Sequence, residues 1–134
     1  MSDTLGADAM LTPHQVIAHL SSLGRELESL VRQLKQAETG DGTDGLPLGA
    51  VFARHKANIA ESKAFLRAEG SMDMRKHEAR VVVADLEEQA LVAEALVRHL
   101  RASTRALEAR IEIGRSLGVA LRGELKLLPF SEGA

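Results

Sequence analysis

Histidines and carboxylates are the side chains of this 134-residue chain that could bind a metal or move a proton, and their spacing supports neither role. The histidines are His14, His19, His55, His77 and His99. His14 and His19 are five positions apart, so they would point to different faces of a helix. Glu61, His77 and Glu78 could meet across a helical hairpin, but they lack the ligand spacing of a zinc site. We therefore expect no metal and no cofactor.

The chain has no cysteine, which excludes a thiolate nucleophile and cysteine-ligated zinc. It also lacks a phosphate-binding glycine loop, a nucleophile elbow and a supported Ser/His/Asp arrangement. Asp85 is a polar insertion beside the apolar pattern, with Arg80 and Glu88 near it. Such a group more often fixes helix register or forms a buried pair than performs catalysis. These observations predict a protein that is not an enzyme.

The elements that carry these residues are predicted to be helices. Hydrophobic residues make up 45% of the chain but aromatic residues only 2%, so leucine, valine, isoleucine and alanine must form the core. This composition suits helix-on-helix packing better than a β-sandwich. Pro13, Pro47 and Pro129 all stand where a helix would begin or end.

The first helix is predicted over residues 12–38. Thr12 can cap it, Pro13 suits its first turn, and Gln15 stands where it would complete a capping box. The leucines that follow are three and four positions apart, which is the spacing of a coiled-coil seam. This seam consists of Leu20, Leu23, Leu27, Leu30 and Leu34.

A second helix and a hairpin turn are predicted next. Residues 39–47 are rich in glycine and aspartate, which indicates a flexible connector. The second helix then runs from about residue 48 to residue 69, with Phe52, His55 and Ile59 on its apolar stripe. Gly70 can end this helix and Ser71 can cap the following one. A turn this short predicts an antiparallel hairpin.

A single long helix is predicted over residues 73–128, because this stretch contains no proline and its apolar residues recur every three or four positions. Ser103 and Thr104 mark the place where it could kink. Gly114, Gly118 and Gly123 each cost up to about 1 kcal/mol in a helix interior, which favours a packing or kink role over no particular role. The seam of this helix includes Leu96, Leu100, Leu107, Ile111 and Leu121.

Together these segments predict an all-α fold: an antiparallel helical hairpin with a long C-terminal helix, coiled-coil-like and assembled as a homo-oligomer. The hairpin with its long helix covers residues 48–128. Residues 1–11 are expected to be disordered, and they resemble no signal peptide because Asp3 and Asp8 replace a basic start. Residues 129–134 form a tail. No segment is apolar enough to cross a membrane, so we expect a cytoplasmic protein.

Charge is distributed unevenly along the chain. Residues 1–47 hold three basic and seven acidic side chains, whereas residues 98–128 hold seven basic and three acidic ones. One interpretation is a stripe of arginines that contacts nucleic-acid phosphate or an acidic patch on a partner. A second is a solvated helix flank, and a third is pairing of the basic segment with the acidic first helix, within a chain or across a dimer. The candidate contact residues are Arg98, Arg101, Arg105, Arg115 and Arg122.

Three segments carry a resemblance to a known group: residues 64–79, with Gly70-Ser71 followed by Asp73-Met74-Arg75-Lys76, residues 98–101, and residues 113–124. In these segments the chain resembles small helical proteins encoded by tailed phages and prophages of Gram-positive hosts. The resemblance covers about half of the chain and omits the first helix. It implies a genetic context near replication and recombination genes, in the cytoplasm of a bacterial host, and it brings no catalytic residues.

The function expected from the sequence is therefore that of a non-enzymatic phage accessory or scaffold protein in DNA replication or recombination. It would act through an oligomeric coiled coil and the basic C-terminal helix. Its expected partners are further copies of itself and either DNA or a replication or recombination protein. Two alternatives remain: a structural coiled-coil protein of phage assembly, or an adaptor or inhibitor that binds a host protein through the first helix.

Overall fold

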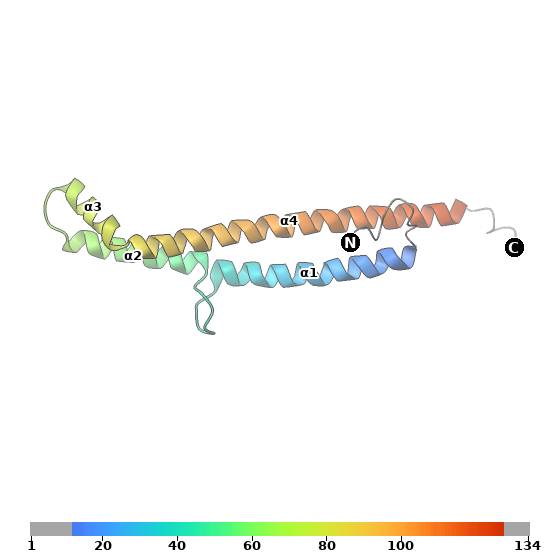
Figure 1. Ribbon diagram of the computed structural model, residues 1–134, viewed down its shortest axis with the longest axis horizontal. Helices are drawn as coiled ribbons and strands as arrows, with labels where there is room; N and C mark the ends of the chain where they lie inside the picture. Colours follow the sequence, from blue (N-terminus) through green and yellow to red (C-terminus); the bar gives the residue numbers. More distant parts are fainter. Residues whose placement is uncertain (1–11, 128–134) are drawn as a thin grey trace, which may run out of the picture. The chain divides into compact units, whose positions relative to one another are not determined.

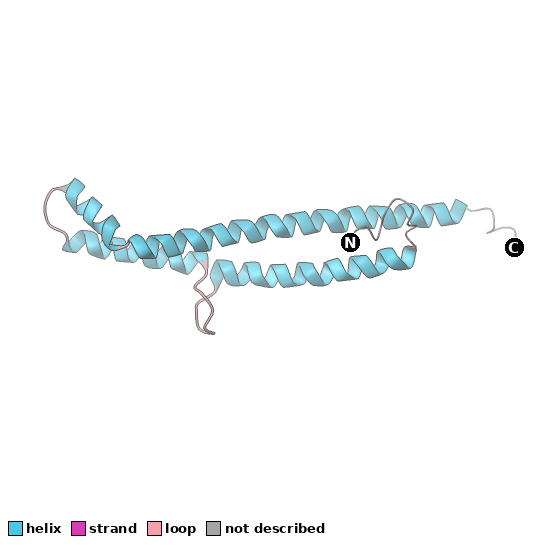
Figure 2. Cartoon of the chain, viewed as in Figure 1, coloured by secondary structure: helices cyan, strands magenta, loops and turns pink. Residues whose placement is uncertain are grey.

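The computed structural model describes residues 12–127, and within them it contains helices and loops but no strand (Figure 1, Figure 2). The helices are α1 (Pro13–Thr39), α2 (Ala50–Arg67), α3 (Met72–Val82) and α4 (Ala84–Leu127). The prediction of an all-α fold is confirmed. The predicted disordered segment 1–11 and the tail 129–134 lie outside the described residues.

The chain divides into two compact units. Unit 1 comprises the described parts of Met1–Ser29 and Thr104–Ala134, and unit 2 is Leu30–Ser103. α1 and α4 therefore each contribute residues to both units.

Unit 1 is built from the first part of α1 and the second part of α4. A Cβ atom added to Gly114 would lie 2.7 Å from Leu20 Cδ2, and one added to Gly118 would lie 3.5 Å from Val16 Cγ1. Because the later glycine meets the earlier residue of α1, the two segments run antiparallel. The buried residues of unit 1 are Val16, Leu23, Thr104, Leu107 and Ile111.

The start of α1 has the predicted cap. The backbone N–H of Thr12 donates to Gln15 Oε1 at 2.8 Å, and the backbone N–H of Gln15 donates to Thr12 Oγ1 at 3.1 Å. These two hydrogen bonds form the capping box, which satisfies backbone donors that a helix start leaves unpaired.

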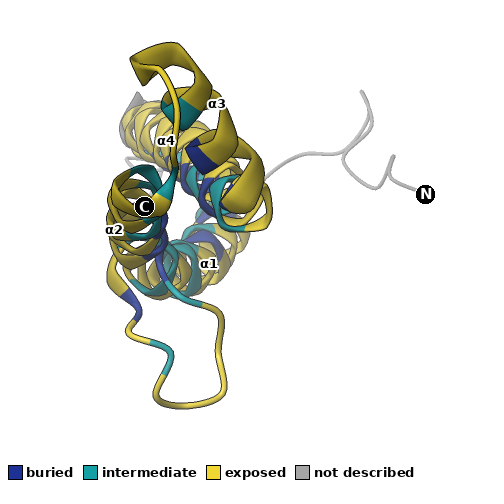
Figure 3. Ribbon diagram, turned by 90° about the vertical axis from the view of Figure 1, so that its left-hand side faces the viewer, coloured by how far each residue is buried: buried dark blue, intermediate teal, exposed yellow. Residues whose placement is uncertain are grey.

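A cluster of small side chains lies in the core of unit 2, where Val83, Val97 and Leu100 are buried as well. Ala53 and Ala57 of α2 pack against Ala90 of α4, and Leu48 and Leu86 are partly buried against them. In Figure 3 the buried and half-buried residues lie where α2 and α4 face each other, and the outer surfaces are exposed. Alanine seams allow two helices to approach closely, but each alanine removes little apolar area from water.

The predicted apolar stripe of the second helix was wrong. Phe52 is 43% exposed and Ile59 is 41% exposed, and His55 is exposed as well. The helix instead buries a stripe of alanines spaced three and four positions apart, of which Ala53 and Ala57 pack against Ala90 of α4. The stripe is Ala50, Ala53, Ala57, Ala60 and Ala64.

The segment between α1 and α2, predicted to be a flexible connector, is a closed loop. The backbone N–H of Gly49 donates to the carbonyl oxygen of Gly40 at 2.8 Å, so the chain returns to the point where α1 ends. A Cβ on Gly49 would lie only 2.5 Å from the backbone nitrogen of Gly40, which requires glycine there. Within the loop, Asp41 Oδ1 accepts hydrogen bonds from the backbone N–H and the hydroxyl of Thr43.

The predicted hairpin turn between the second and third helices is confirmed. Gly70 has a φ of +111°, and Ser71 Oγ accepts a hydrogen bond from the backbone N–H of Met74 at 3.3 Å. α3 then folds back beside α2 (Figure 1). Arg75 fastens the two helices, because its guanidinium donates to the carbonyl oxygen of Phe65 and lies 4.3 Å from the centre of the Phe65 ring.

The prediction of one uninterrupted helix from residue 73 was wrong. Val83 separates α3 from α4, with a φ of −100° and a ψ of 12°. It ends a run of three β-branched valines, which weakens the helix there, and Asp85 and Glu87 then favour a new helix start. No break occurs at Ser103 or Thr104, since α4 continues through both.

Candidate interaction surface

One side of unit 2 is closed by ion pairs. Arg54 of α2 donates to Glu94 with Nε at 3.0 Å and Nη2 at 2.9 Å, and to Glu87 with Nη1 at 2.6 Å. At the end of α1, Glu38 pairs with Arg101 of α4. Glu87, Glu94 and Arg101 are seven positions apart, which places them on one side of α4. We call this the bridged side.

The ion pair between Arg54 and Glu94 shifts the pKa of both residues. The hydrogen bonds that Arg54 donates to Glu94, and then the one to Glu87, raise the pKa of Arg54. The hydrogen bond from Arg54 lowers the pKa of Glu94 below its usual 4.5, and this outweighs the opposing effect of burial. The charge of Arg98 lowers the pKa of Glu94 further. Arg54 and Glu94 therefore both stay charged at neutral pH.

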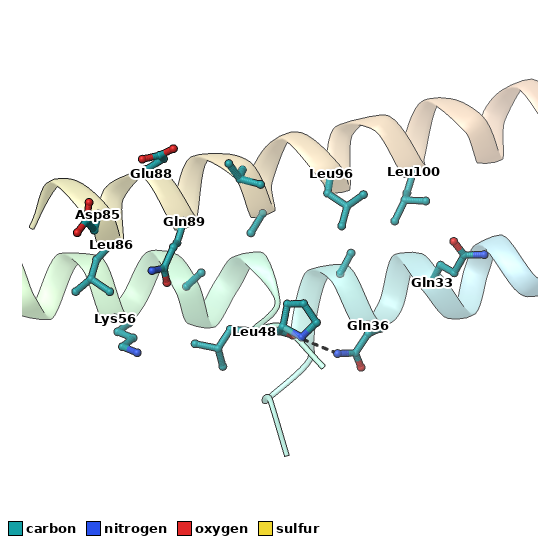
Figure 4. Close-up of a pocket in the computed structure, with 15 residues that line it drawn as sticks. Gln33, Gln36, Leu48, Lys56, Asp85, Leu86, Glu88, Gln89, Leu96 and Leu100 are labelled. Atoms are coloured by element: carbon teal, nitrogen blue, oxygen red, sulfur yellow. Dashed lines mark hydrogen bonds between the residues drawn. The ribbon is translucent and has the colours of Figure 1, made fainter. Parts of the chain in front are cut away.

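The opposite side of unit 2 is open and apolar. A groove of about 860 Å³ runs along α4 beside the end of α1, the loop and α2 (Figure 4). Two smaller grooves of about 310 and 360 Å³ continue it, and all three share Leu86. We call this surface the open face. Its apolar residues include Leu48, Phe52, Ile59, Leu86, Val92 and Leu96.

Large apolar side chains are more exposed on the open face than a stable core would allow. Val92 is 64% exposed and Leu96 is 48% exposed, in addition to Phe52 and Ile59. Among the described residues no large side chain is fully buried. Unit 2 therefore buries Val83, Val97 and Leu100 beside its alanines but leaves several other large hydrophobic residues on the surface. Contiguous exposed apolar surface of this kind marks a site of association.

The two rims of the open face carry opposite charge. The rim on α2 is basic and consists of Lys56, Lys63 and Arg67. The rim on α3 and α4 is acidic and consists of Glu78, Asp85 and Glu88. In Figure 4 Lys56 lies at the lower edge of the main groove and Asp85 and Glu88 lie at its upper edge. All six side chains are exposed, and none forms an ion pair within residues 12–127.

The bridged side has a groove too, but it differs in character. It has a volume of about 580 Å³ and lies between α2 and α3. Polar side chains border it, including Asn58, Glu61 and Ser62. The long apolar floor is thus a property of the open face.

The predicted seam residues fall into two groups. Leu23, Leu100, Leu107 and Ile111 are buried within the chain. Those that are half-buried are Leu20, Leu27, Leu30, Leu34 and Leu121. Leu96 lies outside the seam and lines the open face. The seam of α4 passes through Ala90, Ala93 and Val97 instead.

The predicted arginine stripe is split. Arg101 is paired with Glu38, which fits the interpretation that acidic and basic segments meet within the chain. Arg98 lies near enough to Glu94 to influence its pKa. Arg105, Arg115 and Arg122 are exposed in unit 1 and form no ion pair with the described residues.

The weak metal candidate is not assembled. Glu61 lines the groove on the bridged side, whereas Glu78 belongs to the rim of the open face. Across residues 12–127 no group of three or more His, Asp or Glu side chains could hold a metal ion.

Asp85, predicted to be at or beside the seam, is exposed at the first turn of α4.

The helices that the structure describes include none long and apolar enough to span a membrane.

Sequence reasoning missed the open face and its charged rims. The signal was present, because Lys56, Lys63 and Arg67 recur at seven and four positions, and Phe52 and Ile59 are seven positions apart. The larger residues were assigned to the core because hydrophobicity alone does not distinguish a core stripe from an exposed one.

No family model, no curated protein and no solved structure matches this chain.

Proposed function

We propose that this protein is a non-enzymatic scaffold that acts by binding protein through the open face of unit 2. The observation that carries the proposal is the difference between the two sides of one helix pair. Ion pairs close the bridged side, while the open face offers an apolar floor with large exposed side chains. Burying Val92, Leu96, Phe52 and Ile59 against a partner would supply the hydrophobic stabilisation that the alanine core does not.

The chemistry of the open face also fits a protein partner better than a small metabolite. Its floor is aliphatic, and its charged groups stand along the rims rather than converging on one point. An apolar centre with a charged rim is the usual anatomy of a protein interface. Small-molecule sites instead surround the ligand and aim a few polar groups at it.

Site-specific photo-crosslinking tests this proposal. A photoreactive amino acid is placed at Leu96 on the open face, and in a matched variant at Asn58 on the bridged side. Both positions are exposed, so the photoreactive group is accessible from solvent in both variants. In the cells that make the protein, the Leu96 variant is expected to give one discrete protein adduct and the Asn58 variant none. The absence of a protein adduct at Leu96, or equal adducts at both positions, would contradict the scaffold function.

A second candidate is contact with nucleic acid through the arginines of unit 1. Arg105, Arg115 and Arg122 are exposed cations without an ion-pair partner among the described residues. Guanidinium groups of this kind suit phosphate. This would serve an accessory role in DNA replication or recombination, the context that the resemblance to phage proteins implies. The scaffold and nucleic-acid roles use different residues and can be tested separately.

A further inference from the structure

We infer that the partner of the open face is a second copy of this chain, with α2 of each copy lying on the α3–α4 rim of the other. This inference rests on the proposed function and names the occupant of the same surface. It is carried by the separation of charge between the two rims. One rim is basic, the other is acidic, and their charges are not used within the described chain.

A symmetric dimer requires a surface that is complementary to itself. The open face meets this requirement for one orientation of the two-fold axis. If the axis runs parallel to the helices, rotation places the α2 rim of one copy over the α3–α4 rim of the other at the same height. Lys56 then faces Glu88 of the second copy, and Lys63 faces Glu78, because each pair already borders a shared groove within one chain. Every such contact occurs twice.

The alternative orientation is disfavoured by the same charges. A two-fold axis perpendicular to the helices would lay α2 on α2 and α4 on α4. The basic rims would then oppose each other, and so would the acidic rims, which costs free energy at an interface. The charge pattern therefore selects the arrangement in which the two hairpins run in the same direction.

The apolar floor supplies the attraction between the copies. Leu86, Val92 and Leu96 lie between the rims, and Phe52 and Ile59 extend the apolar surface along α2. In the dimer these residues from both copies would form a core of large side chains between the two alanine seams. The rim charges would then set the orientation and the choice of partner.

The test uses two charge-reversed variants that are designed to bind each other. The basic-rim variant carries Lys56→Glu and Lys63→Glu, and the acidic-rim variant carries Glu78→Lys and Glu88→Lys. A matched control carries Lys76→Glu and Arg80→Glu, which change the charge equally but lie by the groove on the bridged side. Helicity from circular dichroism shows that each variant is folded, and light scattering after size-exclusion chromatography gives its mass.

We expect the unmodified chain and the control to have twice the chain mass. Each rim variant alone should bind itself at least about 100-fold more weakly, because like charges then face each other along both edges of the interface. An equimolar mixture of the two rim variants should recover the dimer, and so should a single chain that carries all four changes. Rim variants that dimerise as well as the unmodified chain would overturn the inference.

The failure of this inference can be told apart from the failure of the scaffold function. An unmodified chain that is monomeric in solution, together with a Leu96 adduct to a different protein, would overturn self-association and leave the scaffold function standing. A Leu96 adduct of twice the chain mass supports both. No adduct from Leu96 overturns the function and with it the inference.

Discussion

Arg54 holds two carboxylates of α4 at once and so connects two turns of that helix to α2. Its planar guanidinium binds Glu94 through two nitrogens and Glu87 through a third. Lysine has a single charged nitrogen and could not reproduce this geometry. At the scale of single residues, this network fixes α2 against α4 along the bridged side.

The lowered pKa of Glu94 predicts that the stability of the fold decreases at acidic pH. Because the folded-state pKa lies below the usual 4.5, the stabilisation is present above that value and is lost as the pH falls through the folded-state pKa. The unmodified chain should therefore lose more stability between about pH 5 and about pH 3 than Glu94→Gln, which has no charge to lose. Urea unfolding at each pH measures this, and parallel profiles for the two proteins would contradict it.

The glycines of the long helices differ in what surrounds them. A Cβ on Gly118 would meet Val16 at an ordinary 3.5 Å, and one on Gly24 would meet nothing within 4 Å. We expect Gly118→Ala and Gly24→Ala each to stabilise the chain by about 0.5–1 kcal/mol, since alanine favours the helix. Gly114→Ala should gain less, because Leu20 would have to move from 2.7 Å.

Thermal and urea unfolding of the three alanine variants provide the measurement. Gly24→Ala is the control, because its site offers open space in the same helix as Leu20. Equal stabilisation by Gly114→Ala and Gly24→Ala would show that Leu20 yields at no cost and that Gly114 has no packing role.

At the scale of elements, α1 and α2 behave as one helix into which a loop has been inserted. The half-buried positions Leu30, Leu34 and Ala37 are four and three apart. Subtracting nine residues for the loop places Ala50, Ala53 and the alanines after them on the same spacing. The hydrogen bond from Gly49 to Gly40 joins the two ends of that insertion. The loop therefore leaves the seam in phase.

Removal of the loop is expected to preserve the packing of unit 2. Deleting residues 41–49 joins Gly40 to Ala50 and keeps the alanines of α2 facing α4. A deletion of residues 41–51 would turn α2 by about 200° relative to α1, because each residue contributes about 100°. We expect the first deletion to retain helicity and a cooperative unfolding transition, and the second to lose stability. Equal behaviour of both deletions would contradict the in-phase insertion.

At the scale of the whole molecule, charge is used in three ways. Some charges pair within the chain, as Arg101 does with Glu38. Others form the two rims of the open face. A third set, the arginines of unit 1, has no described partner, and it is this set that a nucleic acid would contact.

Measurements of DNA binding separate these roles. If nucleic acid is a partner, labelled single-stranded and duplex oligonucleotides should bind at low salt and dissociate steeply as salt rises, since phosphate contacts release counterions. Arg105→Glu combined with Arg115→Glu should abolish this binding. Arg101→Glu should weaken it less, because that arginine is already paired. Fluorescence anisotropy provides the readout, and no binding by the unmodified chain at low salt would end the nucleic-acid proposal.

Local signals in the sequence determined the helical class, the capping box at Thr12 and the turn at Gly70 and Ser71. These features depend on interactions between residues a few positions apart, so the sequence displays them directly. The spacing of the leucines likewise determined which side of α1 is buried.

Only the tertiary structure decided which stripe of α2 and of α4 faces inward. Both helices have two apolar stripes, and periodicity does not rank them. The choice depends on how closely α2 and α4 approach each other, and Arg54 holds these two helices together. Where they meet, Ala57 and Ala90 are buried, whereas Val92 and Leu96 stay exposed. The open face is the consequence.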